Sequence, residues 1–318
     1  MKTVIFGGGG FIGSAITDRL LRDGHTVRIF ERPRVAPYRG FGIAERVEWV
    51  TGDMQSPHDL ASAVDGMDVI LHLASSTLPK NSNEDTVFDV QSNLVTTLQL
   101  LNAMVAGKVG KIVFISSGGT VYGEPKYLPI DETHPTNPLV SYGIIKLAIE
   151  KYLLLYERMH GIRTTILRVS NAYGERQRVE TAQGAVSVFL HRALRGQAIE
   201  IWGDGSATRD FIYVQDVAEA FAKALDYDGE AKILNISSGM GVSLNDLVRM
   251  LEEFIGRRIE ICYLPGRSFD VPVSVLSNEL AKRELAWAPK IALKEGIALT
   301  AKWIRAATLP GQEPLVIN

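Results

Sequence analysis

A run of glycines close to the first residue constrains this sequence more than any other feature. Residues 7–13 read Gly-Gly-Gly-Gly-Phe-Ile-Gly and give a G-x-x-G-x-x-G pattern at Gly7, Gly10 and Gly13. The apolar residues before it predict a buried strand, and the apolar spacing from Ile12 onward predicts a helix. Glycine is needed where a strand turns tightly into a helix and where the backbone approaches a pyrophosphate. The pattern therefore predicts a dinucleotide-binding turn, with the phosphates at the helix N-terminus.

Strands and helices alternate along the first half of the sequence. Apolar runs follow the first strand at 26–30, 47–50, 68–73, 111–115 and 164–169, and long helical patterns cover 86–104 and 141–160. The runs do not alternate between apolar and polar residues, so both faces of the sheet should be covered. Strands that each lead into a helix, joined by right-handed crossovers, predict an α/β fold of the Rossmann type with a doubly wound parallel sheet.

The pattern changes after about residue 170, where the loops are longer and rich in Gly, Arg and Asn. Short strands are expected at 199–201, 233–235 and 260–262, and helices near 184–195, 214–226 and 243–255. We therefore expect a dinucleotide-binding domain over residues 1–170. A smaller C-terminal α/β region over 171–318 is expected to bind the substrate, with some segments returning to the sheet.

Composition excludes several classes of function. The formal net charge of the 318 residues is −2, so no strong field would attract nucleic acid or an acidic membrane. The single cysteine, Cys262, excludes an intramolecular disulfide, and the six histidines lack metal-ligand spacing, so no metal is expected. No apolar run reaches the ~20 residues of a membrane span, and no signal-peptide cleavage site follows the first strand. The expected location is the cytoplasm.

Acidic residues after the second and third strands bear on the choice of cofactor. Glu31 ends the second strand, where a carboxylate can hold both adenosine ribose hydroxyls. It would repel the 2′-phosphate of NADP, so NAD is expected, although Arg32 and Arg34 nearby weaken this preference somewhat. Asp53 follows the third strand and is placed to contact the adenine ring. A helix-capping or turn role fits Asp53 nearly as well.

A Y-x-x-x-K pattern at Tyr142 and Lys146 begins the long helix at 141–160. The i,i+4 spacing places both side chains on one helix face. A tyrosine phenol titrates near ~10, and a neighbouring ammonium and an oxidised nicotinamide both favour its phenolate. The pair therefore suits acid/base catalysis at neutral pH, and Lys146 can also bind the nicotinamide ribose. The same spacing occurs on many amphipathic helices, and the glycine motif favours the catalytic interpretation.

These motifs and several others resemble those of the extended short-chain dehydrogenase/reductase family. Within it, the sequence is most similar to NAD-dependent nucleotide-sugar epimerases such as the UDP-glucose and UDP-N-acetylglucosamine 4-epimerases. The resemblance covers nearly the whole chain. It rests on His72-Leu73-Ala74, Asn93, residues 116–123 (Ser-Ser-Gly-Gly-Thr-Val-Tyr-Gly), Ser141-Tyr142-Gly143, Arg168, Asn171-Ala172-Tyr173-Gly174, Gly203-Asp204-Gly205 and Arg209-Asp210-Phe211.

The resemblance implies a role for each matching residue. Tyr142 would be the acid/base on the sugar 4-hydroxyl, with Lys146 as its partner. The cofactor would contact Gly7, Gly10, Phe11, Ile12, Gly13, Glu31, Arg32, Asp53, Met54, Leu73, Ala74, Ser75, Asn93, Ser116, Tyr142 and Lys146. The nucleotide sugar would contact Asn171, Gly184, Val188, Phe189, Arg209, Arg267 and Asp270. An Arg fork fits phosphate oxygens, but each Arg taken alone could equally form a surface ion pair.

One position departs from the family pattern. These enzymes usually carry a catalytic Ser or Thr three residues before the Val of the V-Y-G motif, and Gly118 occupies that position here. A hydroxyl would have to come from Ser117, from Thr120 or from a water molecule. The departure puts the three-residue catalytic set in doubt, but not the pair of Tyr142 and Lys146.

The same loop separates the reactions that such enzymes catalyse. Nucleotide-sugar dehydratases add an acidic pair just before that Val, because elimination needs an extra acid and base, and this chain has Gly119 and Thr120 there. UDP-glucuronate decarboxylases carry a Glu at the position of Thr120. What remains is 4-epimerisation, by removal and return of a hydride at C4 of UDP-glucose/galactose or UDP-GlcNAc/GalNAc. A 4-keto-sugar reductase, which would normally use NADPH, is the alternative. A non-enzymatic NAD(H) sensor comes third. Such a protein would be expected to lose Tyr142 or Lys146, and both residues are present here.

Two further expectations concern substrate and assembly. By the resemblance, the residue four positions after Asp270 controls the room around the sugar C2 substituent; it is Ser274, which predicts that N-acetyl groups are admitted. The helices at 86–104 and 141–160 resemble those that pair in a family homodimer. Candidate interface residues, some of which must be core residues instead, are Leu94, Leu98, Leu101, Ala148, Tyr152 and Leu155.

Overall fold

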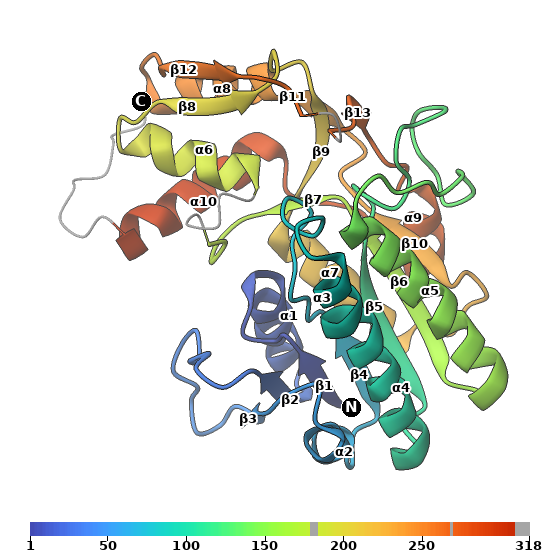
Figure 1. Ribbon diagram of the computed structural model, residues 1–318. Helices are drawn as coiled ribbons and strands as arrows, with labels where there is room; N and C mark the ends of the chain where they lie inside the picture. Colours follow the sequence, from blue (N-terminus) through green and yellow to red (C-terminus); the bar gives the residue numbers. More distant parts are fainter. Residues whose placement is uncertain (179–183, 268–269, 309–318) are drawn as a thin grey trace.

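The computed structural model describes residues 1–178, 184–267 and 270–308. A seven-stranded parallel sheet lies at its centre, in the order β10-β6-β5-β4-β1-β2-β3 (Figure 1). Its strands are β1 (Lys2–Phe6), β2 (Thr26–Glu31), β3 (Val47–Thr51), β4 (Val69–His72), β5 (Lys111–Ser117), β6 (Arg163–Val169) and β10 (Ile233–Ile236). The chain adds strands outward from β1 in one direction and then from β4 in the other. The sheet is therefore doubly wound, and the predicted fold class is confirmed.

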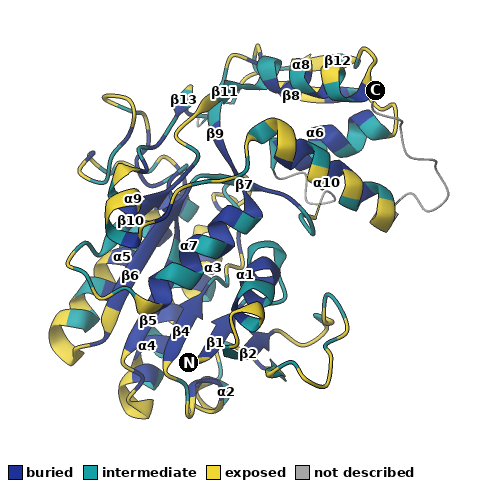
Figure 2. Ribbon diagram, turned by 180° about the vertical axis from the view of Figure 1, so that it is seen from behind, coloured by how far each residue is buried: buried dark blue, intermediate teal, exposed yellow. Residues whose placement is uncertain are grey.

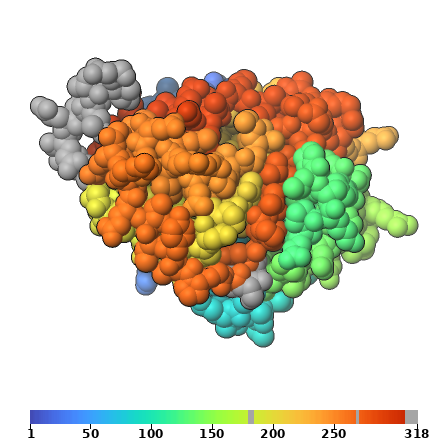
Figure 3. Space-filling model, turned by 90° about the horizontal axis from the view of Figure 1, so that it is seen from above, coloured from blue at the N-terminus to red at the C-terminus, as the bar shows by residue number. Residues whose placement is uncertain are grey.

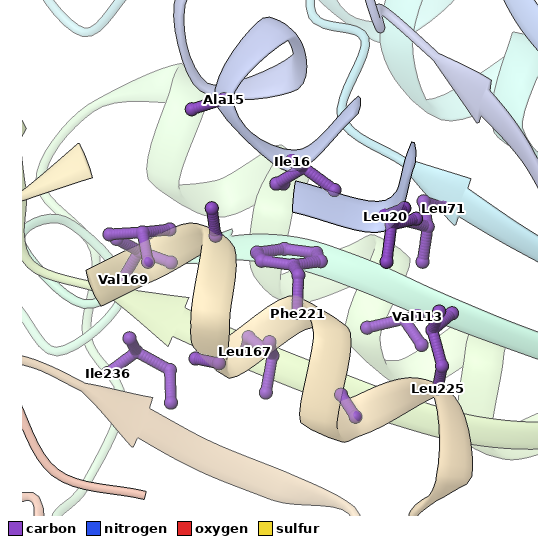
Figure 4. Packing of buried hydrophobic residues seen from close by; sticks show 14 of the residues in the cluster. Ala15, Ile16, Leu20, Leu71, Val113, Leu167, Val169, Phe221, Leu225 and Ile236 are labelled. Atoms are coloured by element: carbon purple, nitrogen blue, oxygen red, sulfur yellow. The ribbon is translucent and has the colours of Figure 1, made fainter. Parts of the chain in front are cut away.

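Helices cover both faces of this sheet. α1 (Phe11–Arg22) and α7 (Val214–Asp226) pack on one face, whereas α2 (Pro57–Val64) and α5 (Ser141–His160) pack on the other. Phe221 of α7 lies among apolar residues of α1 and of the sheet, including Leu167 (Figure 4). The central strands are buried, and exposed residues gather on the outer helix faces (Figure 2). Burial on both faces explains why the strand sequences lack alternation.

The helix expected at 86–104 contains an irregular segment. It consists of α3 (Thr86–Asp89), a π-helical stretch η1 (Val90–Val95) and α4 (Thr96–Gly107). The hydroxyl groups of Thr96 and Thr97 donate to the carbonyl oxygen of Asn93, at 3.3 and 2.6 Å. Wider turns of this kind are frequent at functional sites. This one carries Asn93 and directly follows Asp89, which lies beside the first turn of α5.

The residues after β6 form a smaller region with two sheets of its own. One contains β7 (Asn171–Tyr173), β9 (Thr208–Tyr213), β11 (Gly241–Ser243) and β13 (Val273–Ser274), and the other pairs β8 (Ile199–Trp202) with β12 (Ile261–Leu264). α6 (Ala185–Leu194), α8 (Leu244–Ile255) and α10 (Leu293–Thr308) share a separate apolar cluster with these strands. Seen from above, the C-terminal half in yellow to red forms most of the surface (Figure 3).

The predicted boundary at residue 170 does not divide the molecule in space. β10 pairs with β6 in the large sheet, and α7 packs over the same sheet. α9 (Glu279–Leu285) packs beside both of them. The expected return of C-terminal segments to the sheet is therefore seen, and it anchors the smaller region to the larger one. Within the described ranges, no helix is long and apolar enough to cross a membrane.

Candidate active site

A cavity of about 1440 Å³ lies between the carboxyl ends of the sheet strands and the C-terminal region. Ligands of open α/β sheets bind at this edge, where the strand order reverses. The predicted site residues that line it are Gly7, Gly10, Phe11, Ile12, Gly13, Glu31, Arg32, Asp53, Met54, Leu73, Ala74, Ser75, Ser116, Ser117, Thr120, Tyr142, Lys146, Asn171, Gly184, Val188, Arg209, Arg267 and Asp270. The fold thus brings nearly all the predicted residues to one place.

The glycine turn after β1 has the geometry of a phosphate cradle. Gly7 has a φ of +86°, a conformation that favours glycine. A Cβ atom on Gly13 would lie 2.1 Å from the carbonyl oxygen of Gly7, so α1 approaches the turn only because this side chain is absent. Gly10 precedes α1 and supplies no side-chain cap. The N–H groups of the first helical turn are therefore available to a phosphate in the cavity.

Glu31 lines the cavity at the end of β2 and fits the adenosine ribose of NAD. One of its carboxylate oxygens accepts a hydrogen bond from the backbone N–H of Gly9, at 2.9 Å. Burial raises the pKa of Glu31, and the hydrogen bond from Gly9 partly offsets this effect. Ribose hydroxyls would give this buried carboxylate further donors, whereas a 2′-phosphate would place a second negative charge beside it. The residues present therefore fit NAD.

Asp53 is a turn residue that also lines the cavity. Its Oδ1 atom accepts a hydrogen bond from the N–H of Gln55 at 2.9 Å, and its own N–H donates to Asp59 at the same distance. These bonds make it a turn residue. Asp53 also lines the cavity next to Met54, so a contact with adenine is compatible with the turn.

Tyr142 and Lys146 face the cavity from the first two turns of α5. Gly143 allows the helix to approach the loop after β5, since a Cβ atom there would lie 2.8 Å from the carbonyl oxygen of Thr120. The Nζ atom of Lys146 lies 5.5 Å from the centre of the Tyr142 ring and donates a hydrogen bond to Ile115 at 3.1 Å. The ammonium, the phenol and Thr120 thus share one part of the cavity.

Burial controls the ionisation of this pair. It lowers the pKa of Lys146 to about 8, and the negative charges of Glu150 and Asp89 act in the opposite direction. Burial, together with the smaller effect of the negative charge of Asp89, raises the pKa of Tyr142 to about 12. The protein by itself therefore keeps the phenol protonated near pH 7. A positive charge beside the ring, such as Lys146 or an oxidised nicotinamide, favours the phenolate.

Gly118 does not face the cavity. A Cβ atom on Gly118 would lie 2.3 Å from the Cδ1 atom of Leu276, inside the protein. Its neighbours Ser117, Gly119 and Thr120 do line the cavity. The Oγ1 atom of Thr120 is buried and has no hydrogen-bond partner among the described residues. A buried hydroxyl without a partner is unusual in a folded protein and points to a role, which makes Thr120 the stronger of the two predicted replacements.

Basic and aromatic side chains line the cavity where the C-terminal region forms its wall. Arg267 donates to Asp270 with an Nε–Oδ2 distance of 2.9 Å, and its guanidinium lies 5.2 Å from the centre of the Trp202 ring. Burial lowers the pKa of Arg209, which projects from β9. An anion in the cavity would compensate the burial of this positive charge. The arrangement fits the diphosphate predicted for Arg209 and Arg267.

Two predicted site residues do not line the cavity. Ser274 is buried in β13, which pairs with β9 so that Ser274 lies opposite Arg209. The prediction that Ser274 borders the sugar C2 substituent is therefore not supported, because the strand pairing places this residue inside the protein. Asn93 is also buried. Its side chain donates to Asp89 and accepts from the N–H of Ser76, so it fastens the loop after β4 instead of facing the cavity.

Several residues that line the cavity were not predicted from the sequence. The loop after β4 adds Ser76 and residues 78–80, and the segment after β7 adds Gln177 and Arg178. Trp202, at the end of β8, is the largest of these side chains and is 44% exposed. It directly precedes the Gly-Asp-Gly motif at 203–205, a signal that could have identified it. The loop residues follow no comparable motif.

Comparison with known proteins identifies the family. The model of the NAD dependent epimerase/dehydratase family matches residues 3–237. The chain belongs to this family. The NAD dependence of the family agrees with the glycine turn and Glu31 of this chain. The cofactor of this chain is NAD.

Named relatives within the NAD dependent epimerase/dehydratase family cover nearly the whole chain. A putative UDP-glucose 4-epimerase of Methanocaldococcus jannaschii is 40% identical over 304 residues, which are 95% of this chain and 98% of the relative. The UDP-glucose 4-epimerase of Thermotoga maritima, solved with UDP-glucose, is 33% identical, with a TM-score of 0.91 over 96% of this chain and 99% of that chain. A dTDP-4-dehydro-6-deoxyglucose reductase of Escherichia coli is 30% identical over 95% of this chain and 97% of the relative.

Proposed function

We propose that this protein is a UDP-hexose 4-epimerase, acting on UDP-glucose/galactose or UDP-GlcNAc/GalNAc. The observation that carries the proposal is the position of Tyr142 and Lys146. They line the same cavity as the glycine turn on one side and Arg209 and Arg267 on the other. A nucleotide sugar held by the arginines would present its hexose to the Tyr142 phenol. The names of the relatives from M. jannaschii and T. maritima favour the same reaction.

The residues of the cavity divide the chemistry at C4 between them. Tyr142 accepts the proton of the 4-hydroxyl as the C4–H bond breaks and C4 becomes a carbonyl carbon, and it returns the proton when the hydroxyl re-forms. Lys146 stabilises the phenolate through its positive charge. The unpaired Thr120 hydroxyl donates to the sugar O4 and holds it next to Tyr142. NAD, held by the glycine turn and Glu31, would supply a hydride acceptor for C4 and a hydride donor to the opposite face, so that no net oxidation would occur.

The test is turnover by the purified protein without added cofactor. UDP-glucose, UDP-GlcNAc and UDP-glucuronate are offered separately, and each product is separated from its 4-epimer by chromatography. We expect epimer formation with at least one of the first two sugars. Tyr142→Phe should lower kcat by ~100-fold or more while the protein still contains NAD, because proton transfer is lost and binding is not.

A 4-keto-sugar reductase is the alternative, favoured by the 30% identity to the E. coli reductase. It makes the opposite demand on the cofactor, because each turnover consumes one reduced nicotinamide. If no UDP-sugar is epimerised and a 4-keto nucleotide sugar is reduced when NADPH or NADH is supplied, the reductase replaces the epimerase. If the protein lacks both activities, Thr120 does not compensate for Gly118.

We also propose that the protein is a homodimer, paired through α5 and the helical run from α3 to α4. Exposed apolar side chains gather on these elements; they are Val87, Phe88, Val90, Val95, Val105, Ile144, Tyr152, Leu155 and Met159. Such a concentration is characteristic of an interaction surface. Of the candidate interface residues, Tyr152 and Leu155 are exposed, whereas Leu101 is a core residue.

A further inference from the structure

Asp89 is a fully buried carboxylate beside the active site. Its Oδ1 atom accepts hydrogen bonds from the Thr77 hydroxyl at 2.6 Å and from the Asn93 amide at 2.8 Å, and its Oδ2 atom accepts from the Ser141 hydroxyl at 2.6 Å. We call these four residues the Asp89 cluster. Among the described residues, no cation forms an ion pair with Asp89. A buried charge held only by neutral donors is expensive to maintain and is characteristic of functional sites.

The Asp89 cluster joins three segments that meet at the cavity. Thr77 belongs to the loop after β4, whose neighbours Ser75 and Ser76 line the cavity. Asn93 lies in the π-helical segment, and its amide oxygen accepts from the N–H of Ser76 at 2.8 Å. Ser141 is the first residue of α5. The cluster therefore ties the start of the catalytic helix to the wall of the cavity.

The loop after β4 also caps α5. Val140 precedes the helix and provides no side-chain cap. The N–H of Tyr142 donates to the hydroxyl oxygen of Ser82 at 3.0 Å, and the N–H of Ser141 donates to the amide oxygen of Asn83 at 2.8 Å. Free N–H groups at a helix start need such partners. Here they come from a segment about 60 positions earlier in the sequence, the same segment that Asp89 holds through Thr77.

We propose that Asp89 is a positioning residue, which fixes the first turn of α5 and thereby the Tyr142 phenol relative to the bound sugar. The inference rests on the proposed role of Tyr142. Acid/base catalysis needs the phenol within hydrogen-bond reach of the hydroxyl, and displacement of a reacting group by about 1 Å can cost a large factor in rate. A loosened first turn would leave substrate and cofactor bound but the phenol out of place.

Two variants separate the effect of the hydrogen bond between Asp89 and α5 from the effect of the negative charge of Asp89. Asp89→Asn keeps the shape of the side chain but leaves only one accepting oxygen, so either the bond from Ser141 or the bonds from Thr77 and Asn93 are lost. Ser141→Ala keeps the buried charge and removes only the link to α5. Asp85→Asn is the matched control: Asp85 caps α3 four residues earlier by accepting from the N–H of Phe88, and asparagine caps equally well.

The measurements are kcat, KM, bound NAD and amide hydrogen exchange over residues 138–146. For Asp89→Asn and Ser141→Ala we expect kcat to fall about tenfold with KM within about twofold and NAD retained, because one strong hydrogen bond is lost or weakened. The amides of 138–146 should exchange faster than in the wild type in both variants, and at the wild-type rate in Asp85→Asn.

The proposal is overturned if both variants keep the wild-type kcat and exchange rates, or if they lose NAD and raise KM at unchanged kcat. Exchange does not depend on turnover. If the wild-type protein epimerises no nucleotide sugar, the proposed function fails, and the exchange rates of the two variants still decide whether Asp89 fixes α5.

Discussion

Gly118 and Leu276 are in such close contact that a side chain at position 118 has no room. A Cβ atom on Gly118 would lie 2.3 Å from the Cδ1 atom of Leu276, which is fully buried. The N–H of Gly118 donates to the carbonyl oxygen of Val169 at 2.9 Å, which fixes the backbone next to β6. A serine at this position would therefore point its hydroxyl into the core, away from the cavity.

This contact predicts the effect of restoring the family serine. Gly118→Ser should lower the free energy of unfolding by ~1–3 kcal/mol, the usual range for overpacking a core, and should not raise kcat. Urea denaturation and steady-state turnover measure the two effects. Gly119→Ser is the stability control, since a Cβ atom on Gly119 would meet open space. A Gly118→Ser protein that is as stable as wild type and turns over faster would contradict the contact with Leu276.

Thr120 is predicted to supply the hydroxyl that Gly118 lacks. Thr120→Val removes an Oγ1 atom that is buried without a partner, so it should leave the free energy of unfolding unchanged or slightly higher. The value of kcat should fall by ~10- to 100-fold with KM nearly constant, whereas Thr120→Ser should retain most of the activity. Wild-type kcat in Thr120→Val would assign the hydroxyl to Ser117 or to a water molecule.

The large sheet was predictable because its strands are buried on both faces and so form apolar runs. The helix at 141–160 has the predicted bounds. Its start is marked by the Ser-Tyr-Gly sequence, and Gly161 follows its last residue. The elements not predicted depend on distant pairing. β13 has two residues and exists through its pairing with β9, and β7 has three. Local sequence carries little information about such strands.

The same distinction between local sequence and distant pairing applies to the site residues. Gly13 and the pair Tyr142 and Lys146 follow from local spacing, since a turn and a helix face are set within a few residues. Ser274 was predicted by position relative to Asp270, but the pairing of β13 with β9 turns it into the protein. Asn93 is likewise engaged by Asp89, a contact that depends on how the helix packs. These outcomes are set by tertiary structure, not by motif.

The buried side chain of His72 leads to a prediction of how the free energy of unfolding depends on pH. Burial lowers its pKa to about 3, and the charge of Lys146 acts in the same direction. The folded-state pKa of His72 lies below the unfolded value of ~6.5. As the pH falls below ~6.5, the unfolded state binds more protons than the folded state, so the free energy of unfolding decreases. Between pH 7 and 5 the wild type should lose about 2 kcal/mol more than His72→Gln, measured by urea denaturation. An equal loss in both proteins would show that His72 titrates normally.

The exposed apolar side chains of α5 predict the assembly state. Leu155 is 43% exposed and Met159 is 61% exposed, on the helix face away from the cavity side chains. Light scattering coupled to gel filtration should give the wild-type protein twice the 34.9 kDa of one chain. Leu155→Glu would bury an unpaired carboxylate in the interface and should shift the protein to the monomer at micromolar concentration. Met240→Glu is the control, because Met240 is exposed on the loop between β10 and β11, far from α5 in the sequence. A monomeric wild type, or a Leu155→Glu protein that remains dimeric, would contradict pairing through α5.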